Sequence, residues 1–84
     1  MIHLVYLARL RDALGVSSES VDLPREVSTV RALLAWLSQR GGAWSRELAP
    51  GRAIRVAVNH DVARIDTPIQ AGDEVAVFPP VTGG

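Results

Sequence analysis

The chemically distinctive segment of this sequence is its last eight residues, VFPPVTGG, from Val77 to Gly84. Pro79 and Pro80 restrict the backbone and favour an extended approach. Gly83 and Gly84 have no Cβ, which lets the backbone pass through a narrow channel. We expect the chain to stop at Gly84 and its backbone carboxylate to be the reacting group, which the rest of the domain presents.

The other polar residues form no recognisable catalytic or metal-binding set. The sequence has no cysteine and two histidines, His3 and His60, which argues against a metal site. We interpret His60 as part of a hairpin turn and place His3 at an edge or rim of the sheet. Asp73 and Glu74 are adjacent at the start of a strand, where neighbouring side chains point to opposite faces and make a poor acid–base pair. We therefore expect a chain that is not catalytic alone.

Length and composition predict one small domain with a mostly aliphatic core. The chain has 84 residues, of which 48% are hydrophobic and 5% aromatic, and we treat residues 1–84 as a single domain. The formal net charge is zero and the basic residues, all arginine, are scattered, which argues against a nucleic-acid partner. The sequence lacks a signal-peptide pattern and an apolar run of roughly 20 residues, so that we expect a cytoplasmic protein that does not span a membrane.

Hydrophobic periodicity predicts the elements that position the tail. The predicted strands cover residues 2–8, 19–23, 54–58, 62–64 and 74–78. The main helix begins at Ser28, a favourable N-cap, and ends at Gly41-Gly42. Its apolar stripe comprises Val30, Leu33, Leu34 and Leu37. Shorter helical segments are predicted over residues 9–14 and 43–48.

The order of these elements predicts an α+β fold, with a mixed sheet of about five strands packed on one main helix. The first and last strands are the most apolar, and we place them side by side at the centre of the sheet. Their alternating sets are Leu4, Tyr6, Val75 and Val77, and Val5, Leu7, Ala76 and Phe78. One set packs on the helix, and the other is exposed unless a partner covers it. Residues 79–84 follow as an extended, flexible C-terminal tail.

Three segments of the sequence together resemble a known family. They are Tyr6–Asp12 with Gly15, the pair Val58-Asn59, and the run GDEVAVFPPVTGG from Gly72 to Gly84. Over its whole length the chain resembles the ubiquitin-like β-grasp sulfur carriers that form the small subunits of molybdopterin synthases. A terminal Gly-Gly alone is a weak signal, whereas the complete C-terminal run is specific. Asp12 departs from the family pattern, in which glutamate is more common.

The resemblance implies how the tail reacts. A ubiquitin-activating-like enzyme adenylates the Gly84 carboxylate with ATP, and a sulfur donor converts the acyl-adenylate to a thiocarboxylate. The large subunit of the synthase then accepts the tail, and the sulfur passes to a cyclic pyranopterin precursor to form the dithiolene of molybdopterin. The residues implied to enter the large subunit with Gly84 are Pro79, Pro80, Val81, Thr82 and Gly83.

The resemblance also implies an assembly. The synthase of this family is a heterotetramer of two large and two small subunits. The family pattern keeps the end of the last strand at the subunit interface, which makes Phe78 an anchor, with Leu7 and Val5 beside it. The chain itself is expected to hold no cofactor and no metal, because ATP is used by the activating enzyme.

Other functions remain open at this point. One is a sulfur carrier for another pathway, such as thiazole synthesis or tRNA thiolation, although the FPPVTGG tail argues against thiazole carriers. Another is a ubiquitin-like modifier that joins Gly84 to lysines of target proteins. A third is an interaction domain whose tail is incidental, in which case removal of Gly83 and Gly84 changes nothing.

Overall fold

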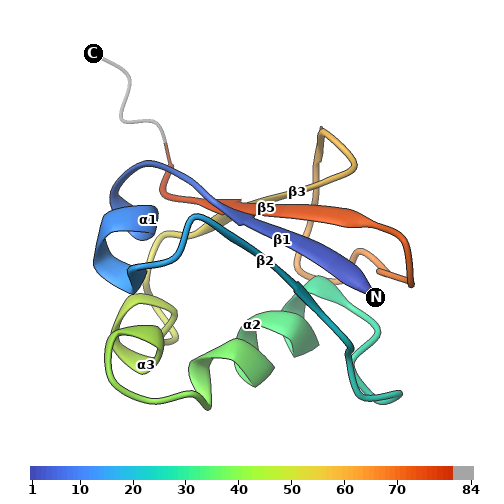
Figure 1. Ribbon diagram of the computed structural model, residues 1–84, viewed down its shortest axis with the longest axis horizontal. Coiled ribbons are helices and arrows are strands. Elements are labelled where there is room, and N and C mark those ends of the chain that lie inside the picture. The colour runs from blue at the N-terminus through green and yellow to red at the C-terminus, as the bar shows by residue number, and fades with distance from the viewer. Residues whose placement is uncertain (81–84) are drawn as a thin grey trace.

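The computed structural model describes residues 1–80, which form a five-stranded sheet with helices packed against it (Figure 1). In chain order the elements are β1 (Ile2–Tyr6), α1 (Ala8–Leu14), β2 (Ser18–Val21), α2 (Val30–Ser38), α3 (Ala43–Glu47), β3 (Arg55–Val58), β4 (Asp61–Val62) and β5 (Glu74–Phe78). None of the helices in this part of the chain is long and apolar enough to cross a membrane.

The strand order across the sheet is β2-β1-β5-β3-β4. β1 and β5 lie side by side at the centre and run parallel, with Leu4 opposite Val75, and the other neighbouring strands run antiparallel. The predicted mixed sheet and the central pairing of the first and last strands are therefore confirmed.

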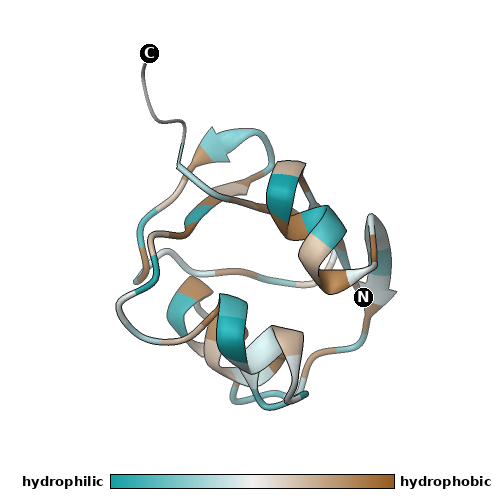
Figure 2. Ribbon diagram, turned by 90° about the vertical axis from the view of Figure 1, so that its left-hand side faces the viewer, coloured by the Kyte–Doolittle hydropathy of each residue, from teal (hydrophilic) through white to brown (hydrophobic). Residues whose placement is uncertain are grey.

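One face of the central strands forms the core. The inward set Leu4, Tyr6, Val75 and Val77 is at most 1% exposed. These side chains pack in one cluster with the α2 residues Val30, Leu33 and Leu37. Leu34, which the predicted stripe includes, is only partly buried at the margin of that cluster. Each helix carries both apolar and hydrophilic residues, as expected for helices between a core and solvent (Figure 2).

The predicted ends of the main helix are wrong by a few residues. Thr29, not Ser28, is the N-cap of α2, and its hydroxyl accepts a hydrogen bond from the Ala32 amide at 3.2 Å. The Ser28 carbonyl instead accepts from the Ile69 amide, which holds Ser28 outside the helix. The helix ends at Ser38, and Gly41-Gly42 lies in the loop to α3, where both glycines have positive φ.

Four of the five strands are shorter than predicted, and β2 and β3 contain four residues each instead of five. β1 ends at Tyr6 because α1 begins at Ala8, directly after Leu7. β4 contains only Asp61 and Val62. It returns from β3 through the tight turn formed by Asn59 and His60, whose φ angles are 51° and 75°.

Candidate functional site

The root of the tail lies where β5 ends. Pro79 and Pro80 follow Phe78 directly, and all three residues are half-buried. The Leu7 amide, just before α1, donates a hydrogen bond to the Val77 carbonyl at 3.1 Å, which holds the end of β5 against the start of α1.

The remaining predicted tail residues lie outside the part of the chain that the structure describes. They are Val81, Thr82, Gly83 and Gly84.

The structure brings the three predicted interface residues together on the outer face of the sheet. Val5 is opposite Ala76, and Leu7 and Phe78 each directly follow the last pair of the register, Tyr6 opposite Val77. Val5, Ala76 and Phe78 are half-buried, and Leu7 is 40% exposed. Figure 1 shows α2 and α3 on the opposite face, and no described element covers this apolar strip.

A groove borders the tail root. It has a volume of about 410 Å³ and is lined by Arg9, Arg52, Ala53, Ile54, Pro79 and Pro80. Arg9 comes from the first turn of α1, and Arg52 comes from the loop between α3 and β3. The two prolines of the tail root and two arginines therefore line the same groove.

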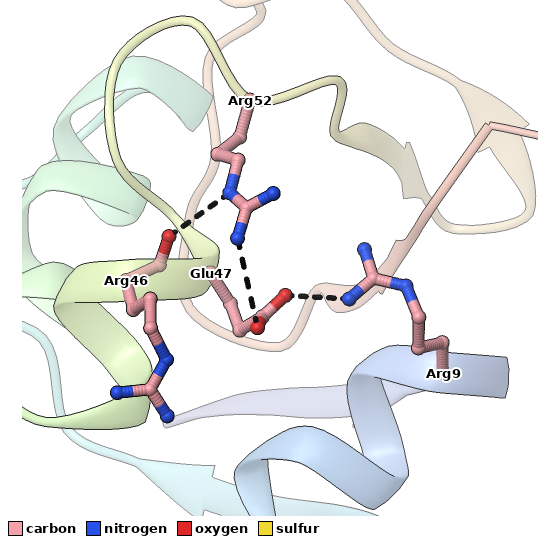
Figure 3. Close-up of polar contacts among 4 residues, drawn as sticks. All are labelled: Arg9, Arg46, Glu47 and Arg52. Carbon is pink, nitrogen blue, oxygen red and sulfur yellow. Dashed lines mark hydrogen bonds and ion pairs between the residues drawn. The ribbon is translucent and has the colours of Figure 1, made fainter.

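Those guanidinium groups converge on Glu47, the one buried charged residue among residues 1–80 (Figure 3). Arg9 Nη1 is 2.8 Å from one carboxylate oxygen, and Arg52 Nη2 is 3.9 Å from the other. Arg52 also donates from Nε to the Arg46 carbonyl at 3.1 Å. The hydrogen bond from Arg9 holds the pKa of Glu47 below its usual value.

Sequence reasoning missed this cluster. Arg9 and Glu47 are 38 residues apart, and no local spacing relates them. The contact exists because α3 packs against α1, and the only sequence signal is a glutamate beside a buried leucine, Leu48.

A second polar network ties the α2–α3 connection to the sheet. The Tyr6 hydroxyl donates to Glu19 at 2.7 Å, and Arg40 binds both carboxylate oxygens of Glu19 at 2.8 and 3.1 Å. The Arg40 guanidinium lies 4.4 Å from the centre of the Trp44 ring. Arg40 lowers the pKa of Glu19, whereas burial raises the pKa of Tyr6. The network joins β1, β2 and the α2–α3 connection and so stabilises the fold.

Asp73 belongs to the turn before β5 and does not form an acid–base pair with Glu74. Its carboxylate accepts from the Gln70 amide at 2.9 Å and from the Asn59 side chain at 3.0 Å. The Asn59 side chain in turn accepts from the Glu74 amide at 3.0 Å. These bonds join the β3–β4 turn to the start of β5, at the end of the sheet away from the tail.

Neither histidine belongs to a reactive cluster in the described residues. His60 is in the predicted turn, with Nε2 3.4 Å from Glu74. His3 is not on an edge strand: it is exposed on the outer face of the internal strand β1, 3.3 Å from the Ser20 hydroxyl. Within residues 1–80, no group of three histidine or acidic residues is placed to hold a metal ion.

Comparison with known sequences gives full-length matches. The sequence profile of the ThiS family matches residues 4–84. The chain is 34% identical to the molybdopterin synthase sulfur carrier subunit of Escherichia coli K12 and 33% identical to that of Haemophilus influenzae. Both alignments cover 100% of each chain.

Solved structures share the fold. SAMP1 of Haloferax volcanii is 31% identical, and the match covers 99% of this chain and 98% of that one with a TM-score of 0.76. A chain in a complex of subunits 1 and 2 of molybdopterin-converting factor from Helicobacter pylori is similar in fold, with a TM-score of 0.64, 19% identity and 99% and 97% of the two chains covered.

Proposed function

Because the chain belongs to the ThiS family, we propose that it is the sulfur carrier subunit of a molybdopterin synthase and acts in molybdenum cofactor biosynthesis. The observation that carries this proposal is identity of 33–34% over the full length of two curated carriers. The chain has the ubiquitin-like β-grasp fold of its structural neighbours. The resemblance that the sequence motifs indicated is thereby confirmed.

The proposed chemistry takes place on Gly84. Its carboxylate oxygen attacks the α-phosphate of ATP in an adenylating enzyme, and pyrophosphate leaves. A sulfur donor then displaces AMP from the acyl group and leaves a thiocarboxylate. Its anionic sulfur is a nucleophile that needs no activating side chain, and transfer to the pyranopterin precursor is completed in the large subunit. We place these reactions in the cytoplasm.

Residues 1–80 position the tail for insertion into a partner. Pro79 and Pro80 limit the conformations of the root, so that less ordering entropy is lost on insertion. Gly84 follows Pro80 by four residues, and four fully extended residues span at most about 14 Å. The tail is therefore long enough to enter a pocket while Phe78, Leu7 and Val5 contact the surface around it, in a heterotetramer of two large and two small subunits.

The test is the mass of the intact chain recovered from its own cells. We expect a fraction in which one oxygen at Gly84 is replaced by sulfur, together with a bound large subunit. A matched variant with one residue added after Gly84 should remain folded and unloaded. A chain that never gains sulfur, or an uncleaved extended variant that still supports sulfur transfer, would contradict the proposal.

A second candidate function is protein modification, because SAMP1, 31% identical to this chain, is a small archaeal modifier protein. The chain has no lysine, so that its own side chains cannot receive an isopeptide bond. Conjugates of Gly84 in a cell lysate would favour this function. Rescue of a strain that lacks the small synthase subunit would instead favour sulfur transfer for molybdopterin over another sulfur pathway.

A further inference from the structure

The charges of this neutral chain are unevenly distributed between the two ends of the sheet. Arg9, Arg52 and Arg55 surround the tail root, with Glu47 as the carboxylate among them. Arg11 and Asp12 of α1 are 3.9 Å apart and offset one another. At the opposite end, where β1 and β5 begin, the carboxylates of Asp22, Asp61, Asp73 and Glu74 outnumber the arginines Arg25 and Arg31. The end that presents the tail therefore has a surplus of positive charge.

The arginines at the tail root remain available to a partner. The side chains of Arg9 and Arg52 are 58% and 48% exposed, although both contact Glu47. A guanidinium group has five N–H donors, and these two use only some of theirs. Arg55 is exposed and forms no ion pair with any residue in 1–80. Glu47 therefore orders two of the three side chains without neutralising the group.

The three arginines flank the tail root on two sides. Arg9 and Arg52 line the groove against Pro79 and Pro80. Arg55 is opposite Phe78 in the antiparallel β3–β5 register, so that it lies on the outer face of the sheet beside the apolar strip. A protein that takes in the tail and covers Phe78 must contact these guanidinium groups.

The length of the tail indicates which kind of chemical group can contact the three arginines. The ATP phosphate that reacts with Gly84 meets the chain at its end, four residues after Pro80. In an extended tail, this point is up to about 14 Å from Pro80. The groups that face the arginines are therefore on the protein surface around the opening, and protein carboxylates match guanidinium groups in charge and in two-pronged geometry.

We propose that Arg9, Arg52 and Arg55 dock on acidic side chains of the large subunit, around the entrance that admits the tail. This inference rests on the proposed function and deepens it. Charges at the rim of an interface mainly raise the rate of association and orient the encounter. The apolar strip around Phe78 then supplies the contact that keeps the complex together.

The experiment measures association with the large subunit of the same organism by stopped flow, at ionic strengths from about 0.01 to about 1 M, over which the Debye length falls from about 30 to about 3 Å. The test variant is Arg52→Gln/Arg55→Gln, which leaves the 2.8 Å pair of Arg9 with Glu47 intact. The control is Arg25→Gln/Arg31→Gln, two exposed arginines at the other end of the sheet.

We expect the wild-type association rate to fall at least about tenfold with salt, and the test variant to lose about tenfold at low salt with a flatter dependence. The control should stay within about twofold of wild type, because its charges are remote from the interface. Equal rates for the test and control variants, or a test-variant deficit that persists at high salt, would overturn the inference. So would an affinity for RNA that the test variant alone loses.

A second readout separates this inference from the proposed function. With large subunit and precursor in excess, the loaded control variant should transfer its sulfur at the wild-type rate, and the deficit of the loaded test variant should shrink as the concentration of the large subunit rises. If the wild-type chain transfers sulfur but associates without dependence on salt, the docking inference fails and the function stands. If the loaded wild-type chain transfers no sulfur, the function itself fails.

Discussion

Val77→Ala should weaken folding more than Phe78→Ala, and Phe78→Ala should weaken binding more than Val77→Ala, because these neighbours on β5 face opposite sides of the sheet. Val77 is 0% exposed in the core, whereas Phe78 is half-buried on the outer strip. Truncation of Val77 removes the equivalent of two buried CH₂ groups and leaves a small cavity, which costs about 2–3 kcal/mol of unfolding free energy. Truncation of Phe78 costs folding about 1–2 kcal/mol, because part of the ring is in water before any partner binds.

The order reverses for binding to the large subunit. A central aromatic anchor costs about 2 kcal/mol or more when truncated, so that Phe78→Ala should raise Kd about 30-fold. Val77→Ala should change Kd by less than about threefold, because its side chain does not reach the interface. Urea denaturation gives the unfolding free energies, and titration calorimetry with the large subunit gives Kd. The reasoning is refuted if Phe78→Ala destabilises the fold as much as Val77→Ala while Kd is unchanged.

Three further predictions concern caps, charges and the groove. Thr29→Ala should lower the unfolding free energy by about 1 kcal/mol, whereas Ser28→Ala should be nearly neutral in the same denaturation assay, since Ser28 does not cap α2. Arg40 depresses the pKa of Glu19 in the folded state. The stability that this ion pair contributes is therefore present above the ordinary glutamate pKa of 4.5 and is lost as pH falls through the folded pKa, and Glu19→Gln should flatten the dependence of the melting temperature on pH in that acidic window. Glu47→Gln should weaken the hold on Arg9 and be visible as changed amide NMR shifts at the tail root, without abolishing sulfur loading; unchanged shifts there would contradict the positioning role of this contact.

The sequence predicted best where a local pattern coincided with a tertiary constraint. The bounds of β5, Glu74–Phe78, agree with the prediction because an apolar run is enclosed between a turn and a proline pair. The N-cap of α2 was displaced because Ser28 and Thr29 both suit the position, and a backbone bond from Ile69 decides between them. Glu47 and its arginines were not predicted at all, since the contact depends on the packing of α1 against α3.

The parallel pairing of β1 and β5 explains why residues near both ends of the chain form one site. Parallel strands end on the same side of the sheet, so that the chain after β1 and the tail after β5 start side by side. Leu7 therefore bonds to the Val77 carbonyl, and Arg9 comes to line the groove beside Pro80. An antiparallel pair would place residues 7–9 at the opposite end of the strands, and Leu7 and Arg9 would not lie beside the tail root. The parallel pairing of β1 and β5, and not any single motif, thus brings together the surface around the tail.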